Sequence, residues 1–248
     1  MIPALETRNL TKRFGSFVAT SDVSLSVRPG ARHALIGPNG AGKTTLINLL
    51  TGVFAANSGQ ILLGGEDITA LPAHARVRRG LSRTFQINQL FADMTPLDSV
   101  MLAIGEREGH GRLGWRPLSA DRVVADEAAA LLERFRLADV MGSATTLLPY
   151  GKQRLLEIAL AIATRPRVLL LDEPAAGVPE EERHEVLGIV RDLPADVTVV
   201  LIEHDMDLVF SFADRISVLV GGALFAEGTV AEISGDARVK AIYLGEDA

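Results

Sequence analysis

Residues 34–45 read Ala-Leu-Ile-Gly-Pro-Asn-Gly-Ala-Gly-Lys-Thr-Thr, and this stretch decides the fold. Ala34, Leu35 and Ile36 form a short apolar run of the kind that is buried on both faces of a parallel sheet. The next eight residues fit the pattern G-x-x-x-x-G-K-[ST], and a helical pattern begins at about Gly42. A strand, a glycine-rich loop and a helix in this order predict a loop that cradles phosphate groups.

The residue types of this loop suit phosphate chemistry. Glycine lets consecutive backbone N–H groups converge on phosphate oxygens, and the start of the helix adds its dipole. Lys43 would neutralise the β- and γ-phosphates of a nucleotide, and the Thr44 hydroxyl would ligate Mg²⁺. The residues expected to bind nucleotide here are Gly37, Asn39, Gly40, Ala41, Gly42, Lys43, Thr44 and Thr45.

A second short apolar run, residues 168–171, ends in the acidic pair Asp172 and Glu173. In an open α/β sheet, ligands collect at the carboxyl ends of the strands, so both acids would face the phosphates. Asp172 would hold hydrated Mg²⁺, and Glu173 would act as the general base on the attacking water. An acidic pair after a strand is by itself more often a turn or a helix cap, and the phosphate loop reverses those odds.

Length and composition set the limits within which these motifs act. The chain has 248 residues and a formal net charge of -6, and this charge argues against a protein that coats nucleic acid. It has no cysteine, which excludes disulfides and zinc–thiolate sites. Its first ten residues hold no apolar core, so we expect no signal peptide and a cytoplasmic chain. Residues 44–65 carry no charge, but Leu46, Leu49, Leu50 and Val53 form the stripe of an amphipathic helix rather than a membrane span.

The hydropathy pattern divides the chain into distinct regions. The first thirty residues alternate as an antiparallel edge sheet does, and strands at 34–36 and 60–64 alternate with helices from 42 and at 71–79. Helical patterns dominate residues 87–150, with an exposed loop expected at 105–117. The remaining expected elements are helices 152–164, 180–191 and 206–212, strands 168–171, 197–202 and 216–220, and a small helix after Gly235.

Five motifs in a fixed order carry a resemblance to a known family. They are residues 37–44, 82–86 (Ser-Arg-Thr-Phe-Gln), 148–153 (Leu-Pro-Tyr-Gly-Lys-Gln), 171–174 (Leu-Asp-Glu-Pro) and 203–205 (Glu-His-Asp). Together they resemble the ATP-binding subunit of ABC transporters. The resemblance implies an α/β P-loop NTPase (RecA-like) core over residues 1–86 and 151–235, with an antiparallel β edge subdomain, a helical insertion at 87–150 and a short tail at 236–248.

The resemblance implies a role for each matching position. Phe14 resembles the aromatic residue that stacks on adenine, although a core aromatic remains an alternative and Phe17 is a rival. Gln86 resembles the glutamine that reaches Mg²⁺ and the attacking water at the hinge to the helical insertion. His204 resembles the switch histidine that would bond the γ-phosphate and hold Glu173.

In the family, two subunits pack head to tail, and Gly151 would belong to the signature motif that closes on the ATP of the partner. Here this motif departs from the usual L-S-G-G-Q, because Pro149, Tyr150 and Lys152 replace a serine, a glycine and a glutamine. Pro179 occupies the usual position of the D-loop aspartate. A proline supplies no hydroxyl and no N–H, so we expect weak contacts to the partner and a second, non-identical ATPase subunit.

Several segments resemble the ATPases of bacterial high-affinity branched-chain amino acid importers and so indicate the branch of the family. They are residues 80–86, the Tyr150-Gly151 pair, and residues 175–177, 203–206 and 243–245. The ATPases of urea import and of lipopolysaccharide export are close alternatives, and a soluble non-transport ABC ATPase is a further one. The resemblance implies permease subunits, indirectly a substrate-binding protein, and a position on the inner face of the membrane. Nucleic acid is not an expected partner.

Overall fold

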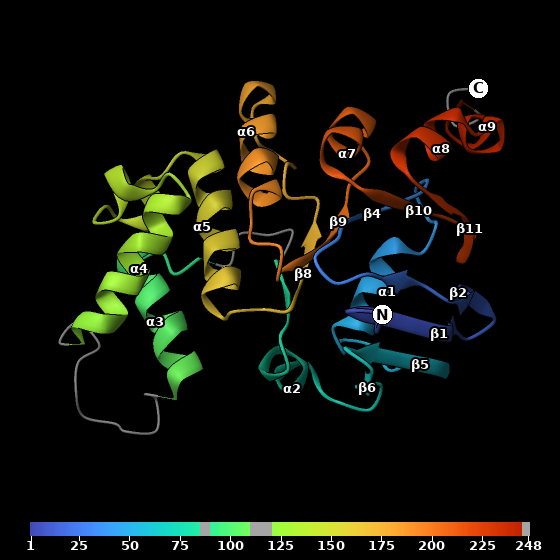
Figure 1. The fold of residues 1–248 in the computed structure, drawn as a ribbon, viewed down its shortest axis with the longest axis horizontal. Helices are drawn as coiled ribbons and strands as arrows, with labels where there is room; N and C mark the ends of the chain where they lie inside the picture. Colours follow the sequence, from blue (N-terminus) through green and yellow to red (C-terminus); the bar gives the residue numbers. More distant parts are fainter. Residues whose placement is uncertain (85–89, 110–120, 245–248) are drawn as a thin grey trace. The chain divides into compact units, whose positions relative to one another are not determined.

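The computed structural model describes residues 1–84, 90–109 and 121–244, and the chain divides into two compact units (Figure 1). The first unit contains residues 1–83, 167–173 and 191–248, and the second contains residues 84–166 and 174–190. The second unit therefore takes in more of the chain than residues 87–150. The boundaries expected for the helical insertion stay a prediction.

The first unit holds an antiparallel sheet with the order β2 (Phe17–Val23), β1 (Leu5–Phe14), β5 (Ser58–Leu63) and β6 (Glu66–Asp67), in which β3 (Ser26–Val27) also pairs with β1. The antiparallel sheet expected in the first thirty residues is confirmed. The strand expected at 60–64 is also confirmed, and as β5 it pairs antiparallel with β1.

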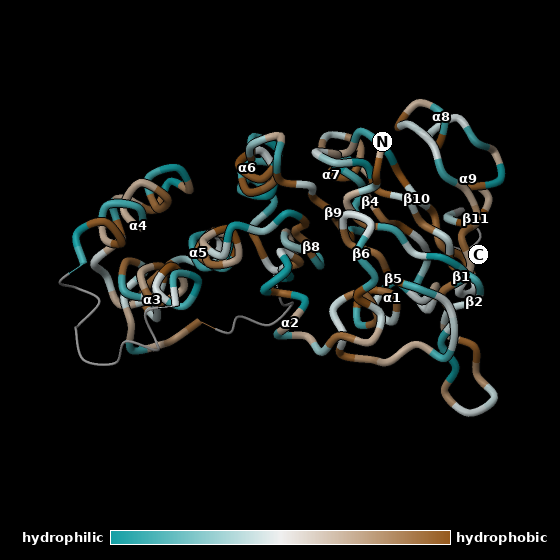
Figure 2. The backbone as a smooth tube through the Cα atoms, turned by 60° about the horizontal axis from the view of Figure 1, so that its bottom comes forward, coloured by the Kyte–Doolittle hydropathy of each residue, from teal (hydrophilic) through white to brown (hydrophobic). Residues whose placement is uncertain are grey.

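The second sheet of this unit has the order β11 (Ala223–Gly228), β10 (Arg215–Val220), β4 (Arg32–Ile36), β9 (Thr198–Ile202), β8 (Val168–Asp172) and β7 (Leu81–Arg83). All neighbouring strands run parallel except β10 and β11. Every residue of β4, β8 and β9 is buried, and Figure 2 colours β9 and β10 largely as hydrophobic. The carboxyl ends of β4, β8 and β9 therefore lie at one edge of the sheet.

Helix α1 (Lys43–Leu50) follows β4 and packs into the core of this unit. Leu46, Leu49 and Leu50 are fully buried in one apolar cluster with side chains of both sheets. The expected stripe also included Val53, and this was wrong, because the helix ends at Leu50 and the Val53 side chain is 57% exposed. Within the described part of the chain, no helix has the length and apolar character to cross a membrane.

The remaining helices of the first unit are α2 (Ala73–Arg78), α7 (Met206–Phe212), α8 (Val230–Gly235) and α9 (Ala237–Leu244). The small helix expected after Gly235 is confirmed as α9. Strand β11 was not expected from the sequence. It pairs antiparallel with β10 across a turn at Gly221 and Gly222, which both have positive φ.

The second unit is helical, with α3 (Pro96–Glu108), α4 (Arg122–Arg134), α5 (Tyr150–Ala163), α6 (Glu180–Arg191) and 3₁₀ turns at Ala138–Val140 and Thr145–Leu147. The exposed loop expected at 105–117 was wrong in its first part, because residues 105–108 belong to α3. A capping box between Thr95 and Asp98 begins this helix, and its buried face extends through Ile104 and Gly105. Residues 110–117 lie outside the described part of the chain.

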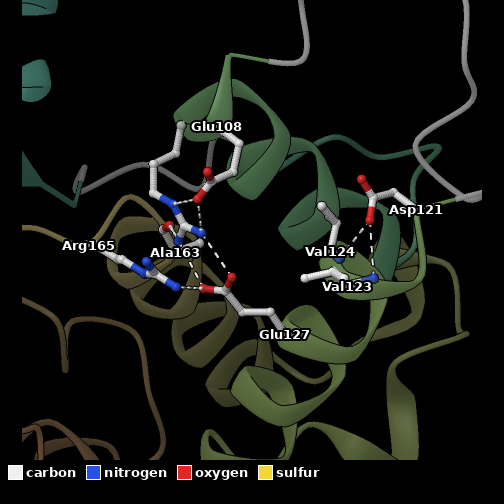
Figure 3. Close-up of polar contacts among 8 residues, drawn as sticks. Glu108, Asp121, Val123, Val124, Glu127, Ala163 and Arg165 are labelled. Atoms are coloured by element: carbon white, nitrogen blue, oxygen red, sulfur yellow. Dashed lines mark hydrogen bonds and ion pairs between the residues drawn. The ribbon is translucent and has the colours of Figure 1, made fainter.

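An ionic network joins three helices of this unit (Figure 3). Arg107 of α3 donates to both carboxylate oxygens of Glu127 of α4, at 2.9 Å each. It also donates, at 2.7 Å, to the backbone oxygen of Ala163, which is the last residue of α5. Arg165 adds a second donor to Glu127 at 3.1 Å. The bidentate pair lowers the pKa of Glu127, and the cations stabilise the C-terminal end of α5.

A buried histidine lies in the parallel sheet of the first unit. The Nε2 atom of His33, in β4, is 2.8 Å from the Ser217 hydroxyl, which in turn donates to Glu227 at 3.0 Å. His33 is therefore the neutral tautomer with its proton on Nε2. Burial lowers the pKa of His33 from 6.5 to about 4, against the opposing effect of Glu227, while the positive charges of Arg215 and Arg28 lower it further.

We predict that the free energy of unfolding falls between pH 6.5 and about 4, because the unfolded chain binds a proton at His33 that the folded chain excludes. The loss from this group is about 3 kcal/mol and is measured by urea denaturation across the pH range. His33→Gln should remove that part of the pH dependence. His184, which is exposed on α6, is the control, and the same loss of pH dependence in His184→Gln would contradict the assignment.

Candidate functional site

The glycines of the loop after β4 meet close backbone neighbours. Gly37 has φ +153 and Gly42 has φ +96, and a Cβ built on them would lie 2.2 Å from the Leu219 oxygen and 2.4 Å from the Ala19 oxygen. Gly40, with φ +76, has open space at the same position. Residues 37 and 42 therefore need glycine both for backbone conformation and for space.

The start of α1 is open to an anion. Gly42 is its N-cap and offers no side chain, and no acidic residue lies in the first turn. Thr44, Asn39 and Gly40 are exposed, Thr45 is half-buried and Ala41 is buried. The ammonium group of Lys43 lies over the loop and donates to the backbone oxygens of Gly37 and Pro38. Backbone N–H groups, a lysine and a hydroxyl thus share one short segment, which is the donor set that phosphate requires.

The two acids that follow β8 differ in their surroundings. Asp172, the last residue of β8, has a side chain only 2% exposed, and its Oδ2 atom accepts a hydrogen bond of 2.6 Å from Arg83 of β7. Glu173 has φ +48, and its backbone N–H donates to Ile202 in β9 at 2.9 Å. This backbone conformation is strained for a residue with a Cβ, and strain of this kind gathers at functional sites.

His204 follows β9 at the same edge of the sheet. Its Nδ1 atom is 3.8 Å from Oε1 of Glu173 and 3.6 Å from Oε2 of Glu203, and its side chain is 68% exposed. The carboxylate of Glu203, only 2% exposed, accepts the backbone N–H of His204 at 3.0 Å. The structure thus places His204 beside Glu173, and it adds Glu203, for which sequence reasoning assigned no role.

Phe14 lies at the end of β1, where it is the cross-strand partner of Phe17. Its side chain is 45% exposed, which does not fit the alternative of a core aromatic. The ring meets Phe54 edge to face with centroids 5.4 Å apart, and the Lys12 ammonium lies 5.1 Å from its centroid. Phe17 is more exposed, at 63%, and the aromatic pairing of Phe14 with Phe54 was not visible in the sequence.

Gly151 lies in the helical unit, in the first turn of α5, and it is buried. A cavity of about 210 Å³ opens there, lined by Arg136, Pro149, Gly151, Lys152, Leu155, Glu182, Glu185 and Val186. Two of the unusual residues of the motif have partners within this unit. The Tyr150 ring lies 5.5 Å from the Arg154 guanidinium, and Lys152 pairs with Asp139. Gln86 lies outside the described residues.

The donor set at the sheet edge fits Mg²⁺. In the ranges 1–84, 90–109 and 121–244, no group of three or more His, Cys, Asp or Glu side chains is placed to hold a metal ion. Mg²⁺ at a phosphate site takes one or two oxygen ligands from the protein and completes its shell with phosphate oxygens and water. The Thr44 hydroxyl and the Asp172 carboxylate are ligands of this kind.

Comparison with known proteins identifies the family of the chain. The ABC transporter family matches residues 20–176, more than half of the chain, and the family described as branched-chain amino acid ATP-binding cassette transporter matches residues 223–248. The chain belongs to the ATP-binding proteins of ABC transporters. This ABC ATPase has the α/β P-loop fold with an antiparallel β subdomain and a helical subdomain, as the sequence predicted. Proteins of this kind bind ATP, hydrolyse it to drive transport, and work in complexes with permease subunits.

Two curated relatives match over 98% of both chains. The high-affinity branched-chain amino acid transport ATP-binding protein BraF of Pseudomonas aeruginosa is 41% identical, and LivG of Escherichia coli K12 is 38% identical. Among solved structures, the ADP conformation of MJ1267, an ATP-binding cassette of an ABC transporter, is 33% identical with a TM-score of 0.86, over 99% of this chain and 100% of that one.

We predict that alanine substitutions at Gly42 and Gly40 separate backbone strain from steric contact. Gly40→Ala should lower the free energy of unfolding by about 1 kcal/mol, because only the positive φ opposes it. Gly42→Ala should cost about 3 kcal/mol or more, because the added Cβ also meets the Ala19 oxygen. Urea denaturation of both variants measures the difference, and equal losses would show that the contact with Ala19 is unimportant.

Proposed function

We propose that this ABC ATPase hydrolyses Mg²⁺-ATP to power import of branched-chain amino acids. The observation that carries the proposal is that Glu173 and His204 follow neighbouring strands, at the sheet edge where β4 leads into the phosphate loop. The match of residues 223–248 and the relatives named above favour amino acid import over the urea and lipopolysaccharide alternatives.

The chemistry divides among five side chains. Lys43 would neutralise the phosphates, and Thr44 and Asp172 would hold Mg²⁺, which offsets charge on the phosphate oxygens. Glu173 would accept a proton from the attacking water while the oxygen of that water bonds to the γ-phosphorus. The bond between the γ-phosphorus and the β,γ-bridging oxygen breaks in the same step, and ADP leaves. His204, 3.8 Å from Glu173, would orient that carboxylate.

Four further roles rest on the resemblance. Phe14 would stack on adenine, with Phe54 holding its ring from the edge. The backbone of residues 37–42 and the Thr45 side chain would complete the phosphate cradle. Gln86 would reach the metal and the water, and Gly151 would close on the nucleotide of a second ATPase subunit.

We predict that Glu173→Gln lowers steady-state ATP hydrolysis at least 100-fold and leaves ATP affinity unchanged, because the amide keeps the shape but cannot accept the proton. A phosphate-release assay and equilibrium nucleotide binding measure the two effects. Lys43→Ala is the contrasting variant and should weaken nucleotide binding itself. Turnover near the wild-type rate in Glu173→Gln would contradict the assigned role.

The finer partners are part of the same proposal. Pro149 and Pro179 supply neither the hydroxyl nor the carboxylate that a partner's ATP would meet, so the working complex would contain a second, non-identical ATPase. Residues 87–150 would contact a permease and place the chain on the inner face of the membrane, with a substrate-binding protein engaged indirectly. The side chain of Val123 at the start of α4, 77% exposed, is available for such a contact.

We predict that isolated Glu173→Gln protein stays monomeric with Mg²⁺-ATP and dimerises only when the second ATPase is added, as measured by mass in solution. A tight ATP-dependent homodimer that hydrolyses ATP at the full rate once Glu173 is restored would count against the mixed pair.

In the complex assembled with permease, a photo-cross-linker at Val123 should capture the permease. Cross-links from Val123 only to other soluble proteins would contradict the permease contact.

A further inference from the structure

An arginine to which the sequence assigned no role lies against a buried acid of the candidate site. Arg83 ends β7, and its side chain is 12% exposed. One guanidinium nitrogen donates to Oδ2 of Asp172 at 2.6 Å, and the other terminal nitrogen donates to the Asn48 side chain on α1 at 2.7 Å. A single side chain therefore connects the strand that carries the acid with the helix that follows the phosphate loop.

The burial of this pair gives the contact its importance. The Asp172 side chain is 2% exposed, and an ionised carboxylate at such a position is costly unless a cation or several donors accompany it. The hydrogen bond from Arg83 is short and charge-assisted, so the guanidinium supplies that compensation from within the chain. The Asn48 contact fixes the second nitrogen and holds the guanidinium at the carboxylate.

We propose that Arg83 is the counter-cation of Asp172 when no nucleotide is bound. Its positive charge disfavours the binding of Mg²⁺ at Asp172 until the phosphates of a nucleotide bind. This inference rests on the proposed function, in which Asp172 holds Mg²⁺. Two cations at one buried carboxylate repel each other, so Mg²⁺ alone gains little at this edge of the sheet. The phosphates of a nucleotide add the negative charge that makes the second cation favourable, and metal and nucleotide therefore bind together.

The decisive variant is Arg83→Met, which keeps an unbranched chain and removes the charge. In EDTA its Tm should fall by about 6 °C or more, because Asp172 loses its compensating cation. Mg²⁺ without nucleotide should restore part of that loss in Arg83→Met and leave the Tm of the wild type unchanged. With saturating ADP, the Mg²⁺ concentration that gives half of the maximal stabilisation should fall about tenfold in the variant, because one repelling charge is gone.

Three further variants separate charge from packing. Arg83→Lys keeps the positive charge and should stay close to the wild type in both measurements. In the Asp172→Asn background, Arg83→Met should no longer increase the response to Mg²⁺, because the carboxylate that both cations share is absent. Arg215→Met breaks another ion pair of the same unit, the 2.9 Å contact with Glu227, and should lower Tm equally with and without Mg²⁺.

The outcomes separate this inference from the proposed function. If wild-type protein shows no Mg²⁺-dependent stabilisation with ADP, the proposed function is wrong at its metal site. If the wild type responds and Arg83→Met needs the same or a higher Mg²⁺ concentration, Arg83 is a structural contact and the counter-cation role is wrong. If Arg83→Met does not fold, an unchanged Mg²⁺ response in the milder variant Arg83→Gln overturns the role in the same way.

Discussion

The strands β4, β9 and β8 lie next to one another in the parallel sheet, and each of their residues is buried. A polar side chain along these strands needs a protein partner, as His33 has in Ser217. Groups that must meet a ligand can only emerge where the strands end. At that edge lie the phosphate loop, Glu173 and His204. The burial of three short strands therefore determines where the chemistry of the molecule can take place.

This arrangement concentrates negative charge at the sheet edge where the proposed function places the phosphates of ATP. Asp172, Glu173 and Glu203 all follow or end β8 and β9, and two of these side chains are nearly inaccessible to water. Such a site needs cations as much as it needs hydrogen-bond donors. Lys43 begins α1 and Arg83 ends β7, and each is held in place by contacts within the chain. The balance of these charges sets how the site distinguishes free metal from metal bound to nucleotide.

The sequence was informative wherever a pattern depends on neighbours along the chain. The buried strands, α1 and the acidic pair could be predicted because apolar runs and glycine spacing are local signals. The partner of Asp172 could not be predicted, because Arg83 lies 89 residues before it in the sequence. Only the pairing of β7 with β8 brings the two residues together. The available signal was a cation between Ser82 and Thr84, within the motif that ends at Gln86. Strand β11 was missed because its side chains alternate only weakly between buried and exposed.

Glu173 has a left-handed backbone, with φ +48, that a residue with a Cβ adopts at a cost of about 1–2 kcal/mol. Glycine would adopt the same conformation without that cost, but it brings no carboxylate. With Glu173 as the proposed general base, folding and hydrolysis therefore favour different residues at this one position. In a library of variants selected for thermal stability alone, Glu173→Gly would be enriched, and the population would drift toward proteins that fold better and hydrolyse nothing. Active descendants would keep the strain and have to recover stability elsewhere in the chain.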